Sequence, residues 1–100
     1  MDVTILKYRE YSKNTLYGFC EISINGLKIR DCSHHRKDEQ EWLNLPSKSY
    51  ESDGQTKYYS LVQFLDKTDH WRFQDAARDA LKRYFAREQT TGTDDVPFNE

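Results

Sequence analysis

Apolar and polar residues alternate along much of the chain, which is the pattern of strands buried on one side. The alternation is clearest over Leu16–Ile24, where an apolar residue or glycine occupies every second position. Asn25-Gly26 follows at once and predicts a hairpin, because both central residues of a type I′ turn need positive φ. Together these signals predict five antiparallel strands, at Val3–Tyr8, Leu16–Ile24, Leu27–Asp31, Glu41–Leu45 and Lys57–Leu65.

The period changes to that of a helix after Asp69. Residues Trp71–Glu88 carry an apolar stripe at helical spacing, and most of their basic residues lie away from it. The stripe consists of Phe73, Ala76, Ala77, Ala80, Leu81 and Tyr84. We therefore predict an α+β fold, in which a five-stranded antiparallel sheet is followed by one C-terminal helix that covers one sheet face.

The chain divides into a sheet-plus-helix domain, residues 1–89, and a tail, residues 90–100. The tail contains three acidic residues and no basic one, and it has too little apolar surface to offset its ordering entropy. We expect it to be a disordered acidic tail. Without Asp94, Asp95 and Glu100, the chain has 14 acidic and 15 basic residues, so the net charge of the domain itself is close to zero.

Composition limits the class of protein further. No run of about 18 apolar residues exists, and no basic stretch precedes an apolar one at the N-terminus, so we expect no membrane segment and a cytoplasmic location. Cys20 and Cys32 are expected to be buried thiols in such a location. Because only 36% of 100 residues are apolar, the core is small, and a homodimer would supply further burial.

The alternation places aromatic rings and cations together on the sheet face that the helix leaves open. Rings stack on unpaired bases and cations neutralise phosphates, so we predict a nucleic-acid site there. Its sheet residues are Tyr17, Phe19, Lys28, Arg30, Trp42 and Tyr59, and its flanking loop residues are Arg36, Lys37, Lys48 and Lys57. The alternatives are a dimer interface or a face that binds another protein.

A metal site is a weaker hypothesis. Asp31, Cys32, His34 and His35 offer suitable donors, but no second paired cluster follows, and we expect the histidines to be solvent-exposed or hydrogen-bonded instead. Nothing orients a Cys–His pair for catalysis, and no glycine-rich phosphate loop exists. We expect no cofactor and no enzymatic activity.

The segment Ile24–Asp31, followed by Trp42–Lys48 and then Asp53-Gly54, resembles the SpoVG (septation protein) family, most specifically in Leu45-Pro46-Ser47-Lys48. Members of that family are small sheet-based dimers that bind nucleic acid, and the resemblance implies a phosphate contact for Lys48. The order of sheet and helix also resembles the coactivator-type and Whirly single-stranded DNA binders, though the sequence likeness is weak.

The tail residues Asp94, Asp95, Val96, Pro97 and Phe98 resemble the acidic Pro-Phe tip of bacterial and phage single-stranded DNA-binding proteins, although here Asn99 and Glu100 follow the phenylalanine. The resemblance implies that these five residues recruit a replication or repair protein. The function expected from the whole sequence is non-catalytic binding of single-stranded nucleic acid, DNA before RNA. The alternatives are a dimeric SpoVG-like regulator that binds duplex DNA or RNA, and a protein–protein adaptor.

Overall fold

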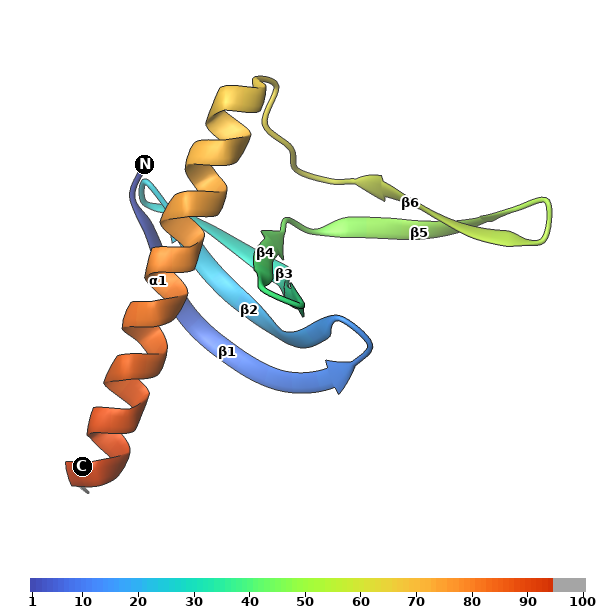
Figure 1. Cartoon of the computed structure of the whole chain (residues 1–100). Coiled ribbons are helices and arrows are strands. Elements are labelled where there is room, and N and C mark those ends of the chain that lie inside the picture. Colours follow the sequence, from blue (N-terminus) through green and yellow to red (C-terminus); the bar gives the residue numbers. More distant parts are fainter. Residues whose placement is uncertain (95–100) are drawn as a thin grey trace.

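The computed structural model describes residues 1–94, and the side chains of residues 88–94 are outside that description. It confirms the predicted α+β class but not the single five-stranded sheet (Figure 1). Six strands form two antiparallel sheets, one with the order β1-β2-β3-β4 and one with β5 beside β6. The elements are β1 (Val3–Lys13), β2 (Leu16–Ile24), β3 (Leu27–Lys37), β4 (Gln40–Asn44), β5 (Ser47–Ser52), β6 (Gln55–Ser60) and α1 (Lys67–Asp94).

Asn, Asp and Gly residues in the left-handed region make the tight turns that join neighbouring strands. Asn25 and Gly26 have φ of 49° and 89°, which confirms the hairpin predicted between β2 and β3. Asp53 and Gly54 have φ of 52° and 74° and join β5 to β6 in the same way. Asp38, with φ of 57°, lies between β3 and β4. These residue types tolerate positive φ at little cost, so the turns fix the strand register.

A bulge in β3 reverses the alternation of its side chains. Ile29 pairs with Ile22 and Cys32 pairs with Cys20, so two residues of β3 face the single residue between them on β2. Asp31, at φ of 62°, is in the bulge. Even-numbered positions after it point inward, and His34 is therefore buried with only 2% of its surface exposed.

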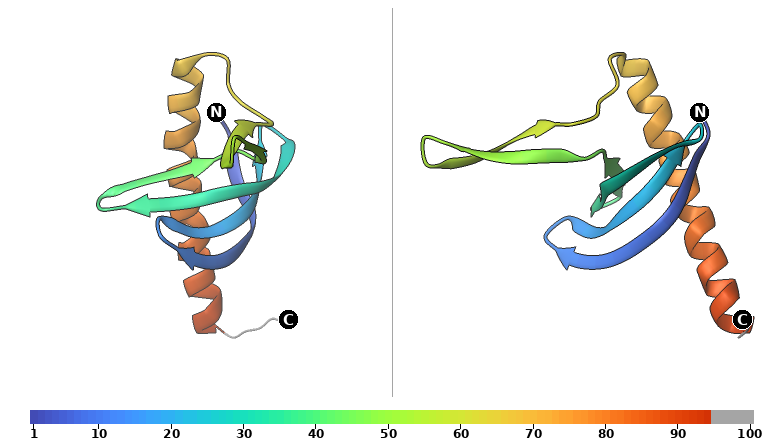
Figure 2. Two further views of the ribbon diagram at one scale, coloured as in Figure 1. Left: turned by 90° about the vertical axis from the view of Figure 1, so that its right-hand side faces the viewer. Right: turned by 180° about the vertical axis from the view of Figure 1, so that it is seen from behind.

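The core lies between one face of the four-stranded sheet and α1, as the two views of Figure 2 show. The predicted helical stripe is confirmed, because Phe73, Ala77, Ala80 and Leu81 are buried against the sheet and its other two members are partly buried. The buried apolar residues are Val3, Ile5, Cys20, Ile22, Ile29, Cys32, Leu43, Phe73, Ala77, Ala80 and Leu81. We call the sheet face away from α1 the open face.

Several predicted boundaries are wrong. The charged loop expected after Asp31 is the second half of β3, because its hairpin with β4 pairs Ser33 through Lys37 with Asn44 through Gln40. The polar loop expected at residues 47–56 holds β5, while the last predicted strand ends at Ser60 instead of Leu65. The helix begins at Lys67 and runs to Asp94, so residues 90–94 of the predicted tail are helical.

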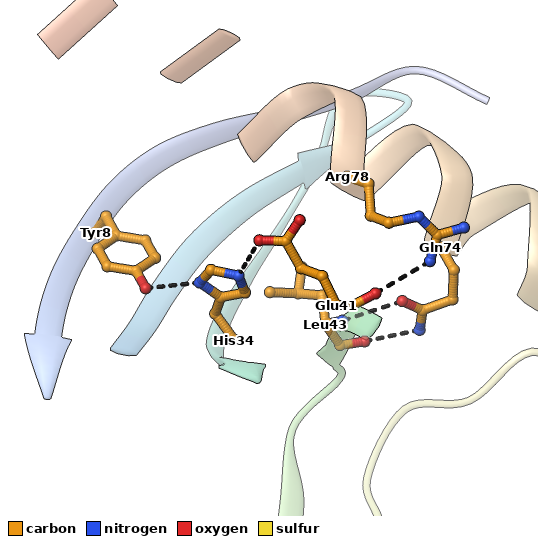
Figure 3. A network of polar contacts seen from close by, with 6 residues as sticks. All are labelled: Tyr8, His34, Glu41, Leu43, Gln74 and Arg78. Carbon is orange, nitrogen blue, oxygen red and sulfur yellow. Dashed lines mark hydrogen bonds and ion pairs between the residues drawn. The ribbon is translucent and has the colours of Figure 1, made fainter. Parts of the chain in front are cut away.

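Side chains of α1 satisfy the free edge of β4, where backbone groups have no further strand to pair with. The Leu43 N–H donates to Gln74 Oε1 at 3.0 Å, and Gln74 Nε2 donates to the Leu43 carbonyl at 2.8 Å. Arg78 Nη1 donates to the Glu41 carbonyl at 3.1 Å (Figure 3). The helix therefore replaces a fifth strand at this edge, which also blocks edge-to-edge pairing with another chain.

Alkaline pH is expected to destabilise the fold through its buried acids. Burial raises the pKa of the Cys20 and Cys32 thiols from 9.0 to about 12 and that of Tyr8 from 10.0 to about 12. In the unfolded chain these groups ionise first, so the stability present below about pH 9 is lost as the pH rises towards 12.

Urea unfolding followed by circular dichroism would measure this loss. We expect a falling midpoint between about pH 8 and pH 10.5, and a shallower fall in a C20A/C32A variant. A midpoint that stays constant over this range would contradict the assignment.

Candidate nucleic-acid interface

Strands β5 and β6 form a two-stranded arm that extends away from α1 and the four-stranded sheet (Figure 1). Within residues 1–94, neither arm strand packs against another strand or helix. The Leu61 N–H donates to the Pro46 carbonyl at 3.0 Å and closes the base of the arm. Because both arm strands are exposed, every side chain on them is accessible to a partner.

One face of this arm carries two lysines and two tyrosines in alternation. Lys48 pairs with Tyr59 and Tyr50 pairs with Lys57, so each cation stands opposite a ring. The two rings are diagonal neighbours with centroids 5.8 Å apart. Tyr59 was predicted on the open face of a single sheet, with Lys48 and Lys57 in flanking loops, and this placement is wrong because all three lie on the strands of a separate two-stranded sheet. That sheet nevertheless brings them together on one face. We call the set Lys48, Tyr50, Lys57 and Tyr59 the arm face.

The arm face carries no acidic residue. Glu51 pairs with Thr56 on the opposite face and accepts a hydrogen bond from its hydroxyl at 3.2 Å. Among the described residues, neither Lys48 nor Lys57 has an ion-pair partner. Both ammonium groups are therefore free to meet phosphates or carboxylates.

The open face of the sheet holds four more of the predicted residues, which are Phe19, Lys28, Arg30 and Trp42. Phe19 lies beside Tyr11 and under the Arg9 guanidinium, whose Cζ is 5.4 Å from the ring centroid. Glu21 offsets the two cations, since its carboxylate is 3.4 Å from Lys28 Nζ and 3.8 Å from Arg30 Nε. The open face is therefore less basic than the sequence alone indicates.

Trp42 is half-buried and stacked on His35, with ring centroids 5.5 Å apart and an angle of 6° between the planes. His35 is held by Thr15 Oγ1 at 3.0 Å from Nδ1 and by Ser33 Oγ at 3.0 Å from Nε2. Burial lowers the pKa of His35, and the neighbouring His34 lowers it further, so both disfavour the protonated imidazole. One face of Trp42 is thus already occupied.

Two predicted residues lie on the other side of the sheet. An irregularity in β2 between Leu16 and Gly18 turns Tyr17 towards His34, with ring centroids 5.9 Å apart. Arg36 lies over the Tyr17 ring at 5.4 Å. The prediction that Tyr17 shares a face with Phe19 is wrong, because alternation fails at the irregularity. Lys37 is exposed at the end of β3, away from the arm.

A polar network around the buried side chain of His34, drawn in Figure 3, lies on the helix-covered face. The Tyr8 hydroxyl and His34 Nδ1 are 2.7 Å apart, and His34 Nε2 is 2.7 Å from Glu41 Oε2. Burial raises the pKa of Tyr8 to about 12, which opposes its action as a nucleophile. The sequence gives no signal for this network, because it depends on the bulge at Asp31.

An open cavity of about 500 Å³ connects the arm with the open face. Ser33 and Asn44, which pair across β3 and β4, line its sheet side, and Tyr58 and Tyr59 line its arm side. Phe19 pairs with Ser33 and is therefore next to the sheet side of this cavity.

His34 and His35, which were expected to be solvent-exposed or hydrogen-bonded, are both hydrogen-bonded to protein groups. Over residues 1–94 no three His, Cys, Asp or Glu side chains gather in a way that could hold a metal ion. In the same residues α1 lacks the combination of length and apolarity that a bilayer crossing requires. Of the predicted tail site, Asp94 closes α1 and Asp95, Val96, Pro97 and Phe98 lie outside the described residues.

No protein-family model matches the chain, and no curated protein or solved structure matches it at a significant level.

Sequence reasoning missed Tyr50. A signal for it exists in the sequence, because Asp53-Gly54 is centred between two stretches in which lysine and tyrosine occur at mirrored positions. Reading Asp53-Gly54 as a hairpin turn pairs Tyr50 with Lys57 and Lys48 with Tyr59.

Proposed function

We propose that this protein binds nucleic acid, single-stranded DNA foremost, through the arm face, and that the open face of the sheet continues the same surface. The observation that carries the proposal is the alternation of two free lysines and two exposed tyrosines on one face of an otherwise unpacked arm. The SpoVG-like motif ends on Lys48, which is one of these lysines.

The chemistry of the arm face suits unpaired bases. A base that stacks on a tyrosine contributes roughly 1–3 kcal/mol, and this contribution depends little on which base it is. Tyr50 and Tyr59 offer two such rings, and each opposing lysine neutralises a phosphate and releases its counterions. The protein holds the strand without cutting or modifying it.

A second candidate function is the binding of duplex DNA, and the shape of the arm favours it. The major groove of B-DNA admits a two-stranded β-ribbon, and the arm is such a ribbon with no other element packed on it. In that case the lysines contact phosphates on the groove walls, and the tyrosines contact base edges. Relative affinity for single strand and duplex separates the two candidates.

Replacing Tyr59 with alanine is expected to weaken binding to single strands roughly 5- to 150-fold, because one stacking ring is lost. Fluorescence anisotropy with a labelled oligo-dT of about 30 nucleotides would measure it. Tyr58→Ala is the matched control, since Tyr58 lies on the opposite face of the same strand. Tyr58→Ala is expected to leave the affinity within about twofold.

The salt dependence of the same titration reports on the lysines. Lys48→Ala is expected to reduce the slope of log affinity against log salt by about 0.7, the value for one phosphate of a single strand. A higher affinity for duplex DNA than for oligo-dT would indicate a regulator that binds duplexes instead of a single-strand binder. An absence of salt-dependent binding to any nucleic acid would overturn the proposal and leave a protein–protein adaptor.

The tail completes the proposal. The carboxylates of Asp94 and Asp95 would steer it to a basic patch on a replication or repair protein, and Phe98 behind Pro97 would fill an apolar pocket there. Phe98→Ala is expected to abolish capture of such a protein while oligo-dT affinity stays unchanged. Equal capture by Phe98→Ala and the unaltered chain would remove the recruiting role.

A further inference from the structure

A groove of about 990 Å³ runs between the edge of β4 and α1. A tryptophan stands on each side of it, Trp42 on β4 and Trp71 on the helix. Trp71 is 61% exposed, which is unusual for the largest apolar side chain on a small protein. We call this feature the tryptophan groove.

The groove is acidic. Its lining includes four carboxylates, Glu39, Glu41, Asp75 and Asp79, against two cations, Arg78 and Lys82. Arg78 is already committed, since it pairs with Asp75 and donates to the Glu41 carbonyl. The Glu41 carboxylate contacts His34 Nε2 at 2.7 Å. Among the described residues of the lining, the carboxylates of Glu39 and Asp79 and the ammonium group of Lys82 have no ion-pair partner, so acid exceeds base by one among the unpaired groups. The occupant that this lining fits is cationic and aromatic.

The arm face has the complementary character. It presents two lysines and two tyrosines without an acidic residue, and neither arm strand packs against its own body. A two-stranded hairpin without such packing is marginally stable in water, so the arm gains stability by docking. Figure 1 shows the arm extending away from α1, so the groove that receives it belongs to another molecule.

We propose that the arm face of one copy docks in the tryptophan groove of a second copy, with the reciprocal contact closing a two-fold dimer. Lys48 and Lys57 meet the carboxylates of Glu39 and Asp79, and the tyrosines pack against the two indoles. The groove is long enough for the arm face, because the pairs Lys48–Tyr59 and Tyr50–Lys57 are about 7 Å apart along the arm and the helix from Trp71 to Lys82 spans about 17 Å.

This docking goes beyond nucleic-acid binding and does not rest on it, although both use the arm face. The two partners compete, because a lysine that contacts a carboxylate of the groove is not available to a phosphate. Nucleic acid is therefore expected to dissociate the dimer.

Sedimentation velocity tests the docking directly. The unaltered chain is expected to form a species of twice its 12.0 kDa mass that dissociates as salt is raised. An arm variant, K48E/K57E, and a groove variant, E39K/D79K, are each expected to be monomeric. K7E/K13E and E51K are the matched controls for added charge outside the contact, and both are expected to remain dimeric.

Mixing the arm and groove variants in equal amounts decides the outcome, because the mixture restores opposite charges at both contacts. A dimer in the mixture alone supports the docking and also shows that both variants are folded. A mixture that stays monomeric, a dimeric arm variant or a monomeric unaltered chain would each overturn it.

Oligo-dT titrations of the same variants keep this result separate from the proposed function. The groove variant is expected to bind oligo-dT and the arm variant to lose binding. Loss of oligo-dT binding in the arm variant together with an intact dimer would overturn the docking and leave the nucleic-acid site standing.

Discussion

Replacing Gly18 with alanine is expected to lower the free energy of unfolding by about 3 kcal/mol. A Cβ atom at this position would lie 2.6 Å from two atoms of the Tyr8 ring and 2.7 Å from the Arg9 carbonyl oxygen. The carbonyl belongs to the neighbouring strand and has little freedom to move. The ring has little freedom either, because Phe85 packs on it with centroids 4.9 Å apart and His34 is hydrogen-bonded to its hydroxyl.

The added methyl group must therefore displace Tyr8, break its hydrogen bond to His34 and loosen the contact with α1. Urea unfolding followed by circular dichroism would measure the loss. Gly26→Ala is the control, because nothing lies within 4 Å of a Cβ atom at this position. Its only expected cost is the backbone strain of an alanine at a φ of 89°, about 1 kcal/mol. If Gly18→Ala costs no more than Gly26→Ala, the close packing of Tyr8 on β2 is wrong.

Replacing Gln74 with methionine is expected to cost about 2–4 kcal/mol, although the two side chains have similar size. Gln74 is the only described side chain that hydrogen-bonds to both the N–H and the carbonyl of Leu43. Leu43 is 1% exposed, so water does not easily replace the lost amide. Two buried backbone groups would then be unsatisfied.

Hydrogen exchange of the Leu43 amide provides a second readout, since its protection is expected to fall more than that of amides inside the sheet. Gln63→Met is the matched control, because Gln63 is exposed and makes no described hydrogen bond. Equal stability of the two variants would show that the edge of β4 does not depend on α1.

The pattern of apolar and polar residues predicted the elements correctly wherever buried positions recur with a regular period. β2 has the predicted bounds, the Asn25-Gly26 turn lies where it was expected, and the apolar stripe of α1 is buried. It was insufficient where stability does not come from burial. β5 is polar and exposed, and its strand conformation rests on pairing across Asp53-Gly54 instead of on an apolar face.

The residues of the candidate site were likewise placed correctly where the alternation is regular and wrongly where it is not. Phe19, Lys28 and Arg30 are on the open face as predicted, because the extra residue of the bulge lies in β3 after Lys28 and leaves the alternation of β2 from Gly18 to Ile24 intact. Tyr17 is on the other face because β2 is irregular next to it, and such irregularities carry little sequence signal. Lys48, Lys57 and Tyr59 meet on the arm, but the arm itself was not predicted.

The hydrogen bond between Leu61 and Pro46 has a consequence for how this protein can change. The chain leaves the body and returns to it at one point, so residues 47–60 form an insertion whose ends already touch. Its length and sequence can vary without disturbing the sheet and helix that carry it. If the arm carries the proposed nucleic-acid site, then the residues that set binding preference and those that hold the fold together belong to separate segments, because neither arm strand packs against the four-stranded sheet or α1.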